Sequence, residues 1–117
     1  MPQPNGHYSQ CIEYNKTLYL SGQLPVDPVS RGMPPTVEEQ TDLALHKIEL
    51  ILKEAGVTKN EIIQVKLYIS DISLWEKVNN RYSLFFGEHK PARSIIPVGK
   101  LHYGCFIEIE VIAQSEK

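Results

Sequence analysis

Two segments of the chain begin with a capping box, a pattern that marks the start of a helix. The strands and loops must therefore lie in the rest of the sequence. The boxes are Thr36-x-x-Glu39 and Ser73-x-x-Glu76. Each is followed by apolar residues at helical spacing and then by a glycine, which favours the end of a helix. These residues are Val37, Ala44, Ile48, Ile51, Leu52 and Ala55 before Gly56, and Trp75, Val78, Tyr82, Phe85 and Phe86 before Gly87. The sequence therefore predicts two amphipathic helices.

Five segments around these helices are predicted to be strands. In the clearest one, apolar and mostly polar residues alternate, which is the period of a half-buried strand. The alternating residues are Ile63, Val65, Leu67 and Ile69 on one face, with Gln64, Lys66, Tyr68 and Ser70 on the other. The remaining strands are expected at Ser9–Tyr14, Thr17–Ser21, Ser94–Val98 and Cys105–Ala113. The proline-rich residues 24–35 are expected to form a loop, because proline donates no backbone hydrogen bond.

The order of these elements, ββ-α-β-α-ββ, predicts the fold class. It is typical of an α+β domain in which one mixed β-sheet is covered on one face by two α-helices. The 117 residues have the size of one domain, so we expect residues 1–117 to fold as a single unit. The other sheet face is expected to carry Tyr68, Phe106 and Ile112. Large apolar groups on an open face favour an oligomer surface.

The charge balance limits the partners of the chain. The net charge is −2 and the isoelectric point is about 6.1. A surplus of basic residues displaces counterions from phosphate, so without one we expect no nucleic-acid partner. The sequence shows no signal-peptide pattern at its start and no apolar stretch of membrane-spanning length. We therefore expect a cytoplasmic protein with no membrane partner, in which Cys11 and Cys105 are reduced.

The usual motifs of cofactor and metal chemistry are missing from the sequence. It contains no phosphate loop, GxSxG elbow, HExxH helix or CxxC pair. The histidines, which lack the spacing of metal ligands, are His7, His46, His89 and His102. We therefore expect neither a metal nor a cofactor.

A few residues remain as candidates for chemistry. Arg93 is expected in a rigid turn after Pro91, where its guanidinium either grips a carboxylate or forms a structural salt bridge. Glu108 and Glu110 lie two apart on a strand and share one face, which is either a solvated acidic face or a site for proton transfer. Tyr8 is either a hinged contact or the start of a strand.

Several short segments occur together in the order and spacing of a known family. They are Gly6-His7-Tyr8-Ser9-Gln10, Ser21-Gly22-Gln23-Leu24-Pro25, Gln40, Val78-Asn79 with Tyr82, Pro91-Ala92-Arg93-Ser94, and Ile107-Glu108-Ile109-Glu110-Val111-Ile112-Ala113. Through them the chain resembles the RidA family, also called YjgF or endoribonuclease L-PSP, along nearly its whole length.

The resemblance implies a chorismate-mutase-like fold and a homotrimer with three clefts between its subunits. It implies that Arg93 and Glu108 are catalytic, Arg93 by gripping the carboxylate of a small-molecule substrate. The residues implied to contact the substrate are Tyr8, Gly22, Asn79, Arg93 and Ile95. Many members carry cysteine in place of Ile95 and proline in place of His7, and these departures bear on substrate preference.

The activity implied by the resemblance is a hydrolytic deamination without a cofactor. Reactive 2-enamine and 2-imino acids, such as 2-aminoacrylate and 2-iminobutyrate, would be converted to 2-keto acids and ammonia. Pyridoxal-phosphate-dependent dehydratases release such compounds, which implies a functional link to those enzymes. Two alternatives stay open: a regulatory module that binds small metabolites in the same cleft, and an endoribonuclease or translation inhibitor.

Overall fold

The computed structural model describes residues 3–4 and 6–115. Residues 1–6, whose proline and glycine content predicts an extended N-terminal arm, fall partly outside the described residues. The strands are β1 (Cys11–Tyr14), β2 (Thr17–Leu20), β3 (Ile62–Ile69), β4 (Ala92–Pro97) and β5 (Ile107–Gln114), and the α-helices are α1 (Val37–Glu54) and α2 (Trp75–Phe86). Short 3₁₀ helices add Lys59–Glu61, Ile72–Leu74 and His102–Gly104 to the predicted order. Neither α-helix combines the length and apolar character needed to cross a membrane, nor does any other described helix.

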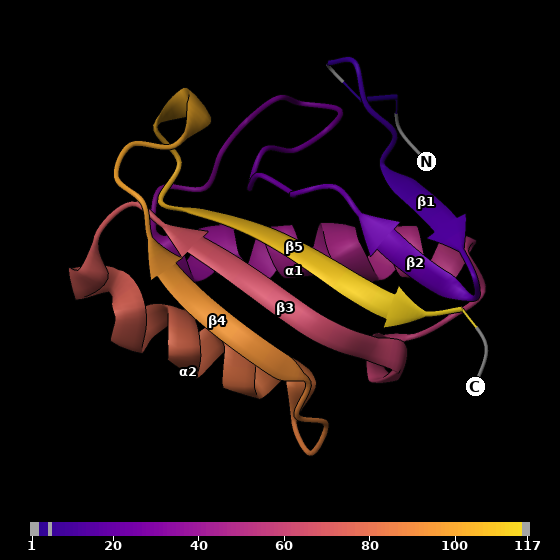
Figure 1. The fold of residues 1–117 in the computed structure, drawn as a ribbon. Helices are drawn as coiled ribbons and strands as arrows, with labels where there is room; N and C mark the ends of the chain where they lie inside the picture. The colour runs from indigo at the N-terminus through magenta and orange to yellow at the C-terminus, as the bar shows by residue number, and fades with distance from the viewer. Residues whose placement is uncertain (1–2, 5, 116–117) are drawn as a thin grey trace.

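The strands form one mixed sheet, in the order β1-β2-β5-β3-β4. The β3–β4 pair is parallel and the other pairs are antiparallel. Both α-helices lie on one face of this sheet (Figure 1). The predicted α+β fold, with two helices over one face of a mixed sheet, is confirmed.

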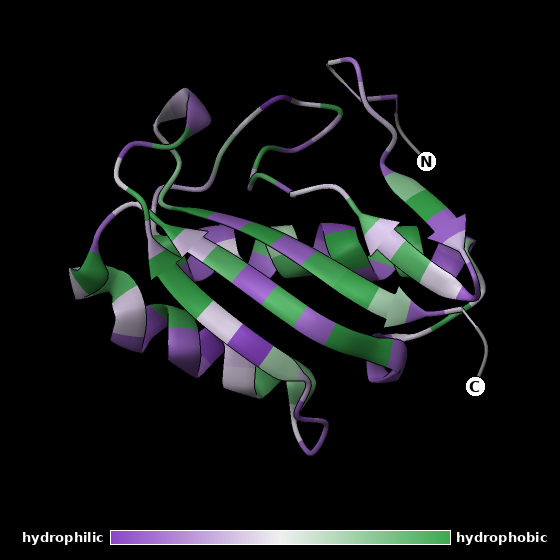
Figure 2. Ribbon diagram, viewed as in Figure 1, coloured by the Kyte–Doolittle hydropathy of each residue, from purple (hydrophilic) through white to green (hydrophobic). Residues whose placement is uncertain are grey.

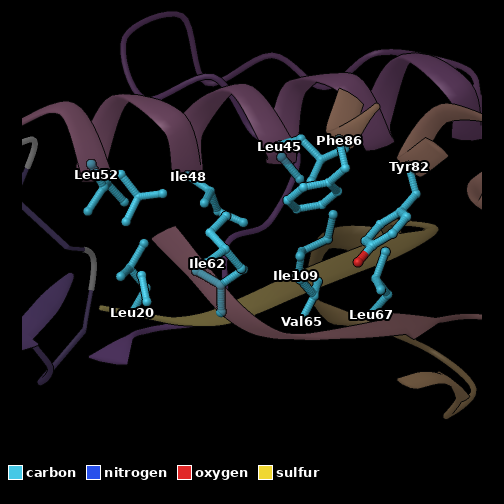
Figure 3. Packing of buried hydrophobic residues seen from close by; sticks show 14 of the residues in the cluster. Leu20, Leu45, Ile48, Leu52, Ile62, Val65, Leu67, Tyr82, Phe86 and Ile109 are labelled. Atoms are coloured by element: carbon cyan, nitrogen blue, oxygen red, sulfur yellow. The ribbon is translucent and has the colours of Figure 1, made fainter. Parts of the chain in front are cut away.

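The core lies between the helices and the covered face. Figure 2 shows green and purple bands alternating along β3 and β5, which is the pattern of strands with one buried face. Figure 3 shows the helices and the sheet meeting through close-packed side chains. Those that it labels are Leu20, Leu45, Ile48, Leu52, Ile62, Val65, Leu67, Tyr82, Phe86 and Ile109. The two predicted apolar stripes therefore supply the helical half of the core.

The prediction that Ile63 faces the core with Val65 is wrong. Ile62 is 2% exposed and Ile63 is 49% exposed. The β3–β5 register shifts between Ile62 and Gln64, as a β-bulge would make it do. The extra residue reverses the alternation there and turns Ile63 outward.

The first predicted capping box is only half formed, and the second is wrong. The Thr36 hydroxyl accepts the backbone N–H of Glu39, but the Glu39 carboxylate accepts from that hydroxyl and not from the Thr36 backbone. At the second helix, Asp71 accepts the backbone N–H of Ser73 at 2.8 Å. A 3₁₀ turn at residues 72–74 follows, and α2 begins at Trp75 without a side-chain cap. Asp71 replaces Ser73 as the capping residue, because an aspartate side chain readily accepts the backbone N–H two residues further along the chain.

The uncovered face of the sheet carries mixed side chains, as predicted. Tyr68 and Ile112 are half-buried on this face, and the neighbouring Tyr19 on β2 is exposed. Phe106, just before β5, is half-buried and packs partly against the core. An apolar and aromatic face of this kind is suited to contact with another protein surface.

Candidate functional site

A cavity of about 790 Å³ opens where the N-terminal arm, the loop after β2 and the start of β5 meet. Tyr8, Gly22 and Glu108, three of the residues implied by the resemblance, line it. The remaining candidates do not line it; they are Asn79, Arg93 and Ile95. A second hollow of about 820 Å³ lies against the arm and shares Tyr8 with the cavity, but it includes neither Gly22 nor Glu108. The candidate chemistry therefore lies at the first cavity.

Gly22 is set directly against the carboxylate of Glu108. The backbone of Gln23 exchanges two hydrogen bonds with that of Ile109, at 2.7 and 3.1 Å, and these fix the loop beside β5. A Cβ atom at Gly22 would lie 2.3 Å from Oε2 of Glu108 and 3.1 Å from its Cδ. Only a residue without a side chain leaves the carboxylate in its place.

The environment of Glu108 disfavours its charged form. Partial burial raises the pKa of its carboxyl, and the nearby Glu110 raises it further, while His102 opposes the shift. Within residues 3–4 and 6–115, no hydrogen bond holds the Glu108 carboxylate. A half-buried carboxyl group with a raised pKa and free oxygens can exchange protons with a ligand in the cavity.

Glu110, one pleat further along the same face, is already engaged. The hydroxyl of Tyr68 donates a short hydrogen bond to its Oε1. This bond is the main reason why the pKa of Tyr68 rises to about 12. Glu110 is also absent from the lining of the cavity. The two carboxylates therefore differ, and Glu108 is the one available for chemistry.

Arg93 lies in a separate cluster, on the edge strand β4. The prediction that it sits in a turn is wrong: β4 begins at Ala92, and Arg93 pairs in register with Val65 of β3. Its Nη1 donates to Oδ1 of Asn79 at 2.7 Å. Its guanidinium carbon lies 4.8 Å from the ring centre of Tyr82 and 5.6 Å from that of Trp75. Among the described residues, no carboxylate forms an ion pair with Arg93.

The register separates the two clusters. Arg93 pairs with Val65, which faces the helices, whereas Glu108 pairs with Tyr68, which faces away from them. Paired residues share a face, so Arg93 and Glu108 lie on opposite faces of the sheet. Ile95 lies on the face of Arg93, where it is half-buried against the core. The chain thus brings Tyr8, Gly22 and Glu108 together, and holds Arg93 with Asn79 elsewhere.

Sequence reasoning missed the neighbours of both clusters. Trp75 was expected only as a member of an apolar stripe, and Tyr82 as a member of that stripe and of a family segment. Both rings nevertheless lie against the Arg93 guanidinium. Lys47 of α1 lines the cavity and donates to the backbone oxygens of Leu24 and Val26, at 2.8 and 3.0 Å. Burial lowers the pKa of Lys47. Neither role leaves a local sequence signal, because each depends on a loop or strand distant in the sequence.

The described residues contain no cluster of three or more His, Cys, Asp or Glu side chains arranged to hold a metal ion. The two cysteines are unpaired, Cys105 being buried and Cys11 half-buried. The polar groups of the cavity and of the Arg93 cluster include carboxylates, a guanidinium, an amide and the ammonium of Lys47, which suit recognition of a small charged ligand.

Comparison with known proteins identifies relatives of the chain. The family described as Endoribonuclease L-PSP matches residues 1–115. A RutC family protein of Pyrococcus abyssi is 38% identical over 116 residues, covering 98% of this chain and 91% of the relative. Escherichia coli TdcF, which carries the name of a candidate reactive intermediate deaminase, is 33% identical over 115 residues, with 96% and 89% covered.

Solved structures agree with these relatives. The Escherichia coli YjgF gene product superposes with a TM-score of 0.92 at 32% identity, covering 98% of this chain and 93% of the other. A crystal structure of Escherichia coli TdcF with bound serine gives a TM-score of 0.91 at 33% identity, with 97% and 92% covered. The match extends over the sheet, both helices and the segments around the cavity, and it confirms the predicted family. The chain belongs to the RidA (YjgF, endoribonuclease L-PSP) family.

Proposed function

We propose that this protein hydrolyses reactive 2-enamine and 2-imino acids, of the 2-aminoacrylate and 2-iminobutyrate type, to 2-keto acids and ammonia. The observation that carries the proposal is the Glu108 carboxyl, half-buried at the cavity wall with a raised pKa and oxygens free of bonds to the described residues. The name given to Escherichia coli TdcF also supports it. The reaction as proposed uses no cofactor, and its substrates are of the kind that pyridoxal-phosphate-dependent enzymes release.

The proposed chemistry adds water across a C=N bond. Glu108, as a carboxylate, accepts one proton of the water while the water oxygen bonds to the imine carbon, and it passes that proton to the nitrogen, which leaves an amino and a hydroxyl group on the same carbon. Glu108 then accepts the hydroxyl proton and delivers it to the nitrogen as the carbon–nitrogen bond breaks, so that ammonia leaves and a keto group remains. A raised pKa suits a carboxyl group that must both accept and return a proton.

Arg93 is proposed to hold the substrate carboxylate, since a guanidinium binds a carboxylate through two parallel hydrogen bonds. Arg93 and Glu108 lie on opposite sheet faces of one chain, which supports a site shared between two copies. We therefore propose a homotrimer in which Arg93 of one subunit meets the cavity of the next. Light scattering coupled to size exclusion is expected to give about three times the 13.3 kDa chain mass.

The test is a coupled assay in which an amino-acid oxidase generates 2-iminobutyrate and its loss is followed with and without the protein. We expect faster loss with the wild type and no acceleration with Arg93→Ala. Loss of the imine at the same rate with and without the wild-type protein would contradict the proposal.

A metabolite-binding module is the second candidate, and the bound serine in the structure of TdcF favours it. Calorimetry with small keto acids separates the two functions, because a module binds without turnover. An endoribonuclease, which the family description suggests, is the third. The net charge of −2 counts against it, and RNA cleavage that survives purification and disappears in Glu108→Gln would support it.

A further inference from the structure

The Arg93 guanidinium is held on three sides by one face of α2. Trp75, Asn79 and Tyr82 occupy positions i, i+4 and i+7, which lie along the same side of a helix. The two rings contact the guanidinium, and the amide oxygen of Asn79 accepts from Nη1 at 2.7 Å. Tyr82 is only 7% exposed, so its ring is a fixed support. These contacts restrict both the plane and the rotation of the guanidinium.

One edge of the guanidinium is left available. Asn79 engages Nη1, and no other described residue accepts a hydrogen bond from Arg93. The free edge is therefore the one formed by Nε and Nη2. Arg81 uses the same two atoms to grip both oxygens of Asp42, at 3.0 and 2.7 Å. The chain thus contains its own example of the bidentate grip that this edge can make.

We propose that Asn79 is a positioning residue that acts through Arg93, and that it does not itself contact the substrate. Its carbonyl oxygen must face Arg93, because a guanidinium only donates hydrogen bonds. With Nη1 occupied and the rings fixing the plane, the Nε–Nη2 edge is oriented before a carboxylate arrives. A ligand then loses less free energy in ordering the arginine side chain. This inference rests on the proposed role of Arg93 as a carboxylate clamp.

The contribution of Asn79 to the binding free energy should therefore depend on whether the ligand has a carboxylate. Asn79→Ala is expected to weaken binding of 2-oxobutyrate about tenfold, the size of one hydrogen bond to a charged group. It should leave binding of 2-oxobutanamide, which has no carboxylate, unchanged. In the imine assay the same variant should raise KM by a similar factor and change kcat little.

The experiment is calorimetry of the wild type, Asn79→Ala and Asn80→Ala with both ligands, after thermal melts confirm that each variant is folded. Asn80 is the matched control, because it is the next residue of α2 and is exposed.

Equal weakening of the acid and the amide by Asn79→Ala would show that Asn79 contacts the ligand directly, and would overturn the inference. Unchanged binding of the acid would overturn it as well. If the wild type binds 2-oxobutyrate but turns over no imine, the hydrolase proposal fails while the comparison of acid and amide still decides the role of Asn79. If the wild type binds no 2-oxobutyrate, the clamp and this inference fall together.

Discussion

Arg93 and Glu108 occupy opposite faces of one sheet and are held there by different means. The guanidinium of Arg93 is fixed by direct contacts, with two rings of α2 and one amide. The carboxylate of Glu108 has no such partner among the described residues and is located by the close approach of Gly22 and by partial burial. Direct contacts thus orient the guanidinium of Arg93, whereas the surrounding residues only limit the positions that the carboxyl of Glu108 can take.

This difference suits the roles proposed for the two groups. A clamp must keep its charge and direction, and a guanidinium stacked on rings keeps both. A proton carrier must titrate, which requires that no strong cation neutralises it. Within one chain the two groups lie on opposite faces of the sheet, so the Arg93 charge of the same chain does not neutralise the carboxyl of Glu108.

The largest effect is expected at Arg93. Arg93→Ala should reduce kcat/KM for 2-iminobutyrate by a factor of tens to thousands, corresponding to about 2–5 kcal/mol for removing one partner of a charged hydrogen bond. Arg93→Lys should lose most of the activity too, since an ammonium lacks the planar fork. Steady-state kinetics measures both, and near-wild-type activity of Arg93→Ala would make the cluster structural.

Mixing two inactive variants tests whether the clusters belong to one site. In heterotrimers assembled from equal amounts of Arg93→Ala and Glu108→Gln, about one cleft in four would combine an intact Arg93 with an intact Glu108 from a neighbouring subunit. Activity should therefore rise from near zero to about a quarter of wild type after refolding the mixture. The two variants refolded separately and then combined are the control. No recovery would contradict a site shared between neighbouring subunits.

Glu108 and Glu110 should respond differently to replacement and to pH. Glu108→Gln is expected to lower kcat about 100-fold, the lower end for general acid–base catalysis. Wild-type kcat should fall as pH drops through the raised pKa of Glu108, because a neutral carboxyl cannot accept a proton. Glu110→Gln should affect kcat little at neutral pH and shift this acid limb to lower pH, since Glu110 raises that pKa. A larger loss in Glu110→Gln than in Glu108→Gln would reverse the assignment.

A smaller effect is expected at Gly22. Gly22→Ala places a methyl group where the Glu108 carboxylate lies, so the side chain must rotate away. We expect a loss of about tenfold in kcat, as for a displaced catalytic group, with little change in melting temperature. Combined with Glu108→Gln, it should add almost nothing. An additive loss in the double variant would mean that Gly22 contacts the ligand itself.

The sequence predicted the sheet, both helices and the covered face because each rests on local signals. Apolar residues recur at a regular spacing along each segment, and a glycine marks the end of each helix. One misread residue therefore changes the predicted element little. The predictions were wrong where two neighbouring residues could each cap a helix, or where pairing with another strand set the bounds of a strand. Asp71 displaced Ser73 as a cap, and pairing with β3 extended β4 to include Arg93.

The candidate site was less accessible to such reasoning. Glu108 and Glu110 are indistinguishable by face, and only the Tyr68 hydroxyl and the cavity separate them. That hydroxyl comes from β3, about forty residues earlier in the chain. Likewise, nothing in the residues next to Arg93 in the sequence indicates that α2 provides the aromatic rings that contact its guanidinium. Contacts between distant segments decide these roles, and one sequence alone does not record them.

The position of β4 at the end of the strand order has a consequence for handling the protein. One row of its backbone groups has no strand partner within the described chain, and such an edge can recruit strands from other molecules. The charge of Arg93 and the missing N–H of Pro97 both discourage that recruitment. A substitution such as Pro97→Val would therefore show its effect first as turbidity in concentrated samples on storage, before any change in catalysis.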